Sequence, residues 1–314
     1  GPFDVTYATS NGTALAGEDY VAQSGTLHFT GGLAGEEHAI DVIINGDQKI
    51  EQDETFTITL TGLSNDFGGT LKLSAPVTMT IKDDDNTPEN KLIRISKTNG
   101  SEDGTDGIFT VSFPAGVTAD KATTVFYSLS GLAQGAGTDY TNTAPTPGQI
   151  VILPNENSRS FNLDINDDII IEGTEEVLMT ITSVQNPVYT AMAGDSPVSL
   201  DILDNDNTEV NNTITLSKVR DGVEGGTNPQ FLVSFPAGLT ASVPTEVSYS
   251  ISGTAVNGVD FTALIGKVTI LANQNSALIN VSLINDQIIE AIENVQLSLT
   301  GATNTISTLK VIST

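Results

Sequence analysis

The chain lacks two residue types and is poor in the aromatic class. Its 314 residues include no cysteine and no tryptophan, and aromatic residues make up only 5%. Without cysteine there can be no disulfide and no thiol nucleophile, so a secreted domain of this kind would need another cross-link, which metal ions could supply. The scarcity of aromatic rings also weighs against a sugar-stacking surface.

Basic residues are scarce as well. Lys and Arg number 12 against 39 Asp and Glu, which gives a formal net charge of −27. Such a chain repels phosphate backbones and anionic lipid surfaces, so nucleic acid is excluded as a partner and a cationic partner is favoured. The sequence also lacks any apolar run near the roughly 20 residues that span a bilayer, so we expect no direct membrane insertion.

The length and composition favour several small β domains. A chain of 314 residues is long enough for two or three domains. Glycine, threonine and serine are frequent, and apolar residues are spread thinly with no sustained helical period. This composition is typical of short strands joined by turns.

Acidic motifs recur along the chain at a spacing of about 120 residues, the signature of an internal repeat. Gly-x-Asp followed by Tyr or Phe occurs at 17–20, 137–140 and 258–261. A second motif, Asp-x-x-x-Glu-x-x-Glu, keeps the same internal offsets in each copy. Its members are Asp47, Glu51, Glu54; Asp168, Glu172, Glu175; and Asp286, Glu290, Glu293.

Apolar residues alternate with mostly polar ones in the same register, which predicts strands with one buried face. The predicted strands contain Phe56, Ile58, Leu60; Val177, Met179, Ile181; Val295, Leu297, Leu299; Ile40, Val42, Ile44; Phe161, Leu163, Ile165; and Ile279, Val281, Leu283. Tyr7, Tyr127 and Tyr249 mark a further strand. Pro-Ala-Gly follows an alternating segment at 114–116 and at 236–238, and the first copy has no counterpart.

These patterns predict an all-β protein made of three tandem immunoglobulin-like antiparallel β-sandwiches. The first repeat spans 1–86 and lacks its opening strands. The second repeat spans 91–207 and is complete, and the third repeat spans 212–314 and lacks a terminal Asp cluster, because we expect the chain to end where that cluster would begin. With linkers of only a few residues, we expect a monomeric rod whose repeats contact their neighbours.

The repeated acids predict a metal site. A lone loop Asp is usually a solvated turn former, but acids that recur three times at fixed offsets repel one another and call for a counter-ion. Two repeats also end in a cluster: Asp83, Asp84 and Asp85 in the first, Asp204 and Asp206 in the second. Hard oxygen ligands without His or Cys suit Ca²⁺ rather than Zn²⁺.

The pattern Gly-Thr-Ala-x-x-Gly-x-Asp-Tyr, then Asp-x-x-x-Glu-x-x-Glu, then Ile-x-Asp-Asp-Asp resembles the Calx-beta repeat family over nearly the whole chain. That family comprises immunoglobulin-like sandwiches found in sodium/calcium exchangers, in an integrin subunit and in very large bacterial surface proteins. The resemblance implies that calcium is held at one tip of each sandwich.

The resemblance also implies a ligand set for each repeat. The second repeat should hold the most complete site, with the Ile170 carbonyl as a possible further ligand; its acids are Glu102, Asp139, Asp167, Asp168, Glu172, Glu175, Asp204 and Asp206. The first repeat offers a weakened site formed by Asp19, Asp47, Glu51, Glu54, Asp83, Asp84 and Asp85. The third repeat keeps Glu224, Asp260, Asp286, Glu290 and Glu293, and we expect its site to be poor.

Three functions fit this pattern. The first is a calcium-stiffened stalk of an extracellular, cell-surface adhesin, which the resemblance links to bacterial arrays including those of gliding motility, with a surface polysaccharide or protein bound through other regions. The second is a calcium-dependent carbohydrate- or ligand-binding module, and the third is a regulatory calcium sensor. An enzyme is not expected, because the two histidines, His28 and His38, occur in one repeat alone and have no repeated partner.

Overall fold

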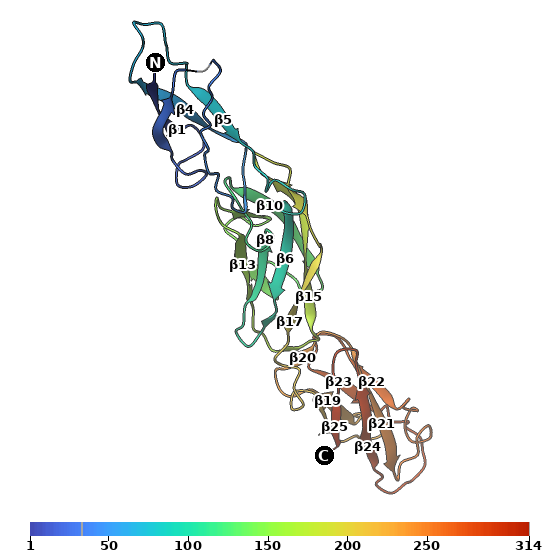
Figure 1. The fold of residues 1–314 in the computed structure, drawn as a ribbon. Helices are drawn as coiled ribbons and strands as arrows, with labels where there is room; N and C mark the ends of the chain where they lie inside the picture. Colours follow the sequence, from blue (N-terminus) through green and yellow to red (C-terminus); the bar gives the residue numbers. More distant parts are fainter. Residues whose placement is uncertain (33, 314) are drawn as a thin grey trace.

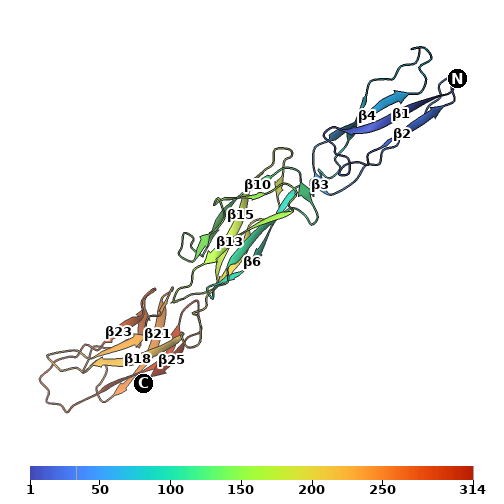
Figure 2. The ribbon, with the colours of Figure 1, turned by 90° about the vertical axis from the view of Figure 1, so that its left-hand side faces the viewer.

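The computed structural model describes residues 1–32 and 34–313, and these residues form strands, turns and loops without a helix. None of the described segments could therefore cross a bilayer as a helix. Three β units follow one another end to end along an elongated molecule (Figures 1 and 2). The predicted all-β tandem sandwich fold is confirmed.

The second repeat is a full sandwich of two sheets. One sheet has the order β12-β10-β15-β17-β7 and the other β11-β13-β8-β6-β16. Their strands are β6 (Leu92–Thr98), β7 (Gly100–Ser101), β8 (Gly107–Ser112), β10 (Thr123–Gly131), β11 (Tyr140–Asn142), β12 (Gln149–Ile152), β13 (Ser158–Ile165), β15 (Glu175–Gln185), β16 (Met192–Ala193) and β17 (Val198–Leu203). Alternate residues of both sheets face a common core that includes Phe109, Phe161 and Met179.

The first repeat has one main sheet, with the order β2-β1-β4-β5. Its strands are β1 (Phe3–Asn11), β2 (Ser24–Phe29), β4 (Glu54–Leu63) and β5 (Val77–Ile81). Its core is small and centres on Ala14, Tyr20 and Phe56. Tyr7 is only half-buried, whereas its equivalents Tyr127 and Tyr249 are 5% and 6% exposed, because the latter two face an opposing sheet.

The strand predicted around Ile40, Val42 and Ile44 does not form in the first repeat. The equivalent segment of the second repeat is β13, which pairs with β8. The described part of the first repeat offers no counterpart of β8, so residues 40–44 are irregular except for one bridge between Tyr20 and Ile44. A half-buried apolar pattern therefore became a strand only where a neighbouring strand supplied hydrogen bonds.

The third repeat has a four-stranded sheet, β23-β19-β18-β25, and a three-stranded sheet, β22-β21-β24. Its strands are β18 (Thr213–Arg220), β19 (Gln230–Ser234), β21 (Thr245–Gly253), β22 (Lys267–Ile270), β23 (Ser276–Asn280), β24 (Val295–Thr303) and β25 (Lys310–Ser313). Of the residues predicted for one strand, Ile279 lies in β23, while Val281 and Leu283 lie beyond its end.

The last strand of the third repeat lies further from the position of an Asp cluster than expected, because we predicted that the cluster would begin where the chain ends. β25 pairs in parallel with β18, just as β16 pairs in parallel with β6. Asn304 and Asn186 confirm this register, because each amide donates to the equivalent threonine hydroxyl, at Thr245 and Thr123. Residues 310–313 thus correspond to 192–195, so the described chain stops short of both the strand equivalent to β17 and the Asp cluster.

At each junction between repeats, one isoleucine of the preceding repeat packs into the core of the next. β3 (Lys49–Ile50) pairs in parallel with β9 (Thr118–Ala119), and β14 (Ile170–Ile171) pairs in parallel with β20 (Thr240–Ala241). Ile50 and Ile171 are both 0% exposed and belong to the core of the following repeat. The backbone also crosses each junction, where Asp120 N donates to Ile50 O at 3.2 Å and Ser242 N to Ile171 O at 3.1 Å.

Candidate metal centres

The second repeat gathers two groups of carboxylates at its end nearest the third repeat. Asp139, Glu172 and Glu175 form one group, in which the chosen oxygens all lie within 4.8 Å of one another. Glu102, Asp204 and Asp206 form the other group to the same limit. These acids sit at the ends of β7, β14 and β17 and at the starts of β11 and β15, so five strands deliver them to one place.

The carboxylates of the second repeat are held close together and are partly shielded from solvent. Glu102 is 5% exposed. Its burial and the charge of Asp204 raise the pKa of Glu102 to about 8, and burial together with the charge of Asp168 raises that of Glu172 to about 7. Burial also raises the pKa values of Glu175 and Asp204. A cation placed among these oxygens would offset their mutual repulsion.

Backbone hydrogen bonds fix the positions of these oxygens. Asp204 accepts a hydrogen bond from Glu172 N at 2.7 Å and another from Asp206 N at 2.6 Å. Asp204 thereby ties the loop of the second acidic motif to the exit of the repeat. Asp168 and Glu172 also act on the pKa of Glu102, so the two groups form one continuous acidic tip.

The donor set fits Ca²⁺. Calcium takes six to eight oxygen ligands in flexible geometry, and it commonly combines carboxylates with backbone carbonyls. The tip of the second repeat offers carboxylates from several loops, prearranged around a small volume, with no His or Cys among the grouped residues. A single loop could not supply this number of oxygens, whereas the convergence of five strand ends does.

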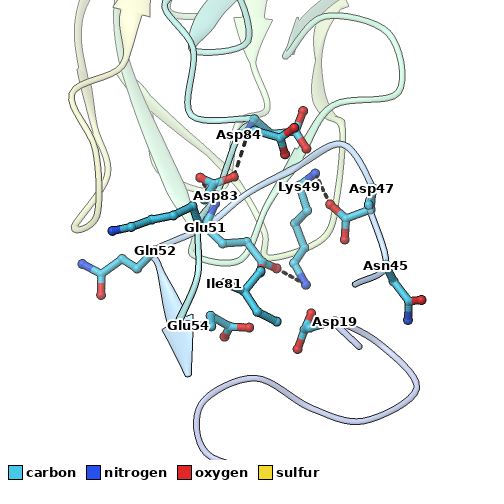
Figure 3. A pocket seen from close by; sticks show the side chains of 13 residues that line it. Asp19, Asn45, Asp47, Lys49, Glu51, Gln52, Glu54, Ile81, Asp83 and Asp84 are labelled. Atoms are coloured by element: carbon cyan, nitrogen blue, oxygen red, sulfur yellow. Dashed lines mark hydrogen bonds and ion pairs between the residues drawn. The ribbon is translucent and has the colours of Figure 1, made fainter. Parts of the chain in front are cut away.

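The first repeat builds a similar tip, but it has a lysine among its acids and, in its described part, no equivalent of Glu102. Asp19, Glu51 and Glu54 form one group and Asp83, Asp84 and Asp85 the other (Figure 3). Glu51 N donates to Asp83 at 3.1 Å, as Glu172 N does to Asp204. The Nζ of Lys49 forms an ion pair with Glu51 inside the group, where the lysine side chain is 23% exposed. The first repeat therefore carries its own cation where the second repeat has Ile170.

In the third repeat only one group forms among the described residues. Asp260, Glu290 and Glu293 bring oxygens within 4.8 Å of one another, but Glu290 and Glu293 are exposed. Glu224, the counterpart of Glu102, is also exposed. It lies outside the group, although its charge contributes to the raised pKa values of Glu290 and Glu293. In the part of the chain that the structure describes, no Asp cluster lies at this tip, and its glutamates are open to solvent.

Several predicted ligands lie beside the groups rather than in them. Asp47, Asp168 and Asp286 each accept a hydrogen bond from the backbone N–H two residues later, at 2.8, 2.7 and 2.6 Å. Each aspartate thus shapes its own loop with one oxygen and leaves the other free for an ion. Asp167 accepts a hydrogen bond from Asn205 Nδ2 at 3.0 Å.

Sequence reasoning missed two features of the tips. Lys49 was not singled out, although its equivalents in the other repeats, Ile170 and Ile288, are apolar. That departure from the repeat pattern is the signal that could have found it. Asp120, from the second repeat, contributes to raising the pKa of Glu54 in the first. One Asp120 oxygen is buried without a hydrogen-bond partner. A residue from the next repeat could be placed at this site only by the tertiary structure.

Tandem β-sandwiches with acid-lined tips define a class of modular repeat proteins. The Calx-beta domain model matches this chain three times, at residues 2–85, 84–206 and 204–311, and the chain belongs to the Calx-beta domain family. Sodium/calcium exchanger 2 from Rattus norvegicus and that from Homo sapiens are each 30% identical to it over 190 residues. The match covers 53% of this chain and 19% of the exchangers, so it concerns about a fifth of their length.

Solved structures of the same kind also resemble the chain. CBD12 from CALX1.2 is 14% identical, with a TM-score of 0.30, over 68% of this chain and 81% of that chain. The calcium binding domain CBD12 of CALX1.1 is 19% identical, with a TM-score of 0.25, over 64% of this chain and 87% of that chain.

Proposed function

We propose that this chain is a calcium-binding tandem array in which ions bound at the sandwich tips fix the angle between successive repeats. The observation that carries the proposal is a loop with two roles. Between Asp168 and Glu172 the same few residues present carboxylates to the acidic tip and insert Ile171 into the core of the third repeat. An ion bound there would hold the loop that makes the junction.

The exit of each repeat supports the same proposal. Asp206 is bonded to the linker, because Asn211 Nδ2 donates to its backbone oxygen at 2.9 Å and to its carboxylate at 3.1 Å. Asn90 makes the equivalent bonds to Asp85. Asn207 Nδ2 bridges the junction by donating to Glu172 O at 2.9 Å and Ile306 O at 3.0 Å. An ion that orders these acids would also order the linker.

The biological setting that we propose is the stalk of an extracellular, cell-surface adhesin. Such a stalk would hold a binding region away from the cell, and its target would be a surface polysaccharide or protein bound through other regions. Tyr127, Tyr140 and Tyr249 are buried in the sandwich cores rather than displayed to sugars, which favours a stalk over a carbohydrate-binding module.

A calcium sensor is the second candidate, favoured by the match to sodium/calcium exchanger 2. A sensor and a stalk make different demands on the junction. In a sensor, calcium should move one repeat to a new position relative to the next, whereas in a stalk it should narrow the range of positions without a large change in their mean.

Two measurements test the proposal. Calorimetric titration and thermal unfolding in chelator, Ca²⁺ and Mg²⁺ should show selective calcium binding, with a stabilisation of about 2.7 kcal/mol per site at a hundredfold excess over Kd. Titration without heat, together with superimposable unfolding curves, would refute calcium binding.

Stiffness is measured separately, by the distance between spin labels at Thr26→Cys and Thr269→Cys. Both positions are exposed and the chain has no other cysteine. Calcium should narrow the distance distribution, while an unchanged width would refute stiffening and a shifted mean would favour the sensor. The variant Asp195→Asn is the control, because the Asp195 side chain is 94% exposed and lies outside the grouped acids, so the response of the distance distribution to calcium should be unchanged.

A further inference from the structure

The third repeat has an exposed isoleucine, Ile289, for which no receiving strand lies among the described residues. Ile289 holds the position of Ile50 and Ile171, three residues after the first aspartate of the acidic motif. Ile50 and Ile171 are each 0% exposed, whereas Ile289 is 101% exposed. Beside it, Ile288 and Ile292 are 67% and 102% exposed. Full exposure of neighbouring isoleucines is costly and marks an interaction surface.

The loop of Ile289 already has the local shape of its two buried equivalents. Asp286 accepts a hydrogen bond from Ile288 N, as Asp47 does from Lys49 N and Asp168 from Ile170 N. Ile284 N donates to Asp260 O at 2.9 Å, and the equivalent bonds at Asn45 and Asn166 are both 3.0 Å. The loop directly precedes β24, away from the second repeat (Figure 1). The isoleucine is therefore presented by a formed turn.

The two formed junctions show what receives such an isoleucine. Ile50 lies opposite Ala119 and Ile171 opposite Ala241, each in a short parallel strand. Both receiving strands follow Pro-Ala-Gly and one further residue, at 114–117 and 236–239. Ala119 and Ala241 are 2% and 1% exposed, so a small residue leaves space for the isoleucine beside a sandwich core.

We propose that the loop from Asp286 to Glu293 is a docking surface for a further β-sandwich repeat, which would receive Ile289 beside the small residue of a Pro-Ala-Gly-x-Thr-Ala segment. A second copy of this chain does not fit, because its two such segments are already filled by Ile50 and Ile171. The proposal extends the tandem array described above, but it depends on apolar burial and not on whether the acids bind calcium.

The experiment extends the full chain with a second copy of residues 197–314 attached after Thr314. Because Lys310 corresponds to Met192, this addition restores the strand equivalent to β17, the Asp cluster and a new repeat with a free receiving segment. Cysteines replace Ile288 and the Thr240 of the added copy, and a short bifunctional maleimide is applied. The formed junction supplies the positive control, with cysteines at Ile170 and the original Thr240, which are Cα partners.

We expect both pairs to cross-link at comparable rates in calcium and in chelator. Ile289→Ser should slow the new cross-link at least about tenfold, given what burying an isoleucine contributes. Ile289→Val should retain it, and Ile265→Ser, at a residue that is 85% exposed outside the loop, should leave it unchanged.

Once circular dichroism has shown that the added repeat is folded, a new pair that fails to cross-link while the control pair reacts would overturn the docking surface. Insensitivity of the new cross-link to Ile289→Ser would overturn it as well. Loss of calcium binding with the cross-link intact would refute the proposed calcium function alone.

Discussion

The acidic tips of the first and second repeats are built from similar carboxylates on equivalent loops, yet they differ in the residue beside the acidic motif and in an acid that only the second tip has. Lys49 of the first repeat forms an ion pair with Glu51, whereas Ile170 of the second leaves Glu172 without such a partner. The second tip also has Glu102, which is buried. Similar sets of acids therefore do not make equal metal sites, because a lysine among the acids competes with the ion for the same oxygens.

The junctions of the two repeats, in contrast, are nearly identical. Ile50 and Ile171 each enter the next core through a two-stranded parallel ladder. The apolar contact at the junction is thus the same in both repeats, whereas the charges at the tip differ. Mutations can therefore separate the contribution of the apolar contact to stability from the contribution of the charges to calcium binding.

The largest effect should come from the junction isoleucines. Ile171→Ala should lower the free energy of unfolding of the third repeat by about 2 to 5 kcal/mol, the usual range for a buried isoleucine, and Ile50→Ala should act similarly on the second repeat. Denaturant unfolding followed by circular dichroism measures both. Ile289→Ala is the control, expected within about 0.5 kcal/mol of the parent. Equal effects at all three positions would contradict the junction role.

The next effect concerns removal of charge from the second tip. Glu172→Gln with Asp204→Asn should weaken calcium binding there at least about a hundredfold, because a carboxylate near a divalent ion contributes on the order of 1 to 4 kcal/mol. Glu51→Gln with Asp83→Asn should remove only the sites of the first repeat, which we expect to be the weaker class. Calorimetric titration resolves the two classes, and loss of the weaker class from the first double variant would reverse our ranking.

The pH dependence of stability and of calcium affinity should further distinguish the second tip from the first. The pKa values of about 8 for Glu102 and about 7 for Glu172 exceed the ordinary value of 4.5, so the folded state retains protons that the unfolded state releases. In chelator, this contribution to stability is fully present below about pH 4.5 and is lost as the pH rises through about 7 to 8. Calcium must displace these protons, so its affinity should rise over the same range.

The check is calcium titration of the second tip between pH 6 and 8, in the variant with Glu51→Gln and Asp83→Asn. Affinity should increase by up to about tenfold per pH unit for each proton released. A flat profile would show that the carboxyls are already ionised. Thermal unfolding in chelator over the same range should show the opposite trend, with stability falling as pH rises.

The smallest effect is the exchange of the residue that distinguishes the tips. Lys49→Ile should tighten calcium binding to the first repeat by about tenfold, and Ile170→Lys should weaken the second by a similar factor, as expected for one charge at a partly exposed site. Lys82→Ile is the control, because Lys82 pairs with Asp53 outside the grouped acids. If both swaps leave calcium affinity unchanged, calcium displaces Lys49 from Glu51 without a measurable free-energy cost, and the lysine does not distinguish the tips.

Much of the fold and of the site could be predicted from the sequence because both repeat. Threefold recurrence of acids and of alternating apolar residues indicated the sandwich class, and the structure brings Asp139, Glu172 and Glu175 together although they are distant in the chain. The predicted strand at residues 40–44 failed because strand formation depends on a hydrogen-bonding neighbour, which a local pattern does not reveal. The pairing of β25 with β18, likewise, depends on a strand distant in the sequence.

By itself the sequence determined the repeat period, the kind of fold and the chemistry of the tips, because these depend on residue types at fixed local offsets. Only the tertiary structure decided which acids share a volume, that Lys49 lies among them and that Asp120 influences them from the next repeat. It also decided that Ile50 and Ile171 are buried while Ile289 is exposed. Burial and charge coupling depend on what packs against a residue, and that partner lies far away in the chain or in another repeat.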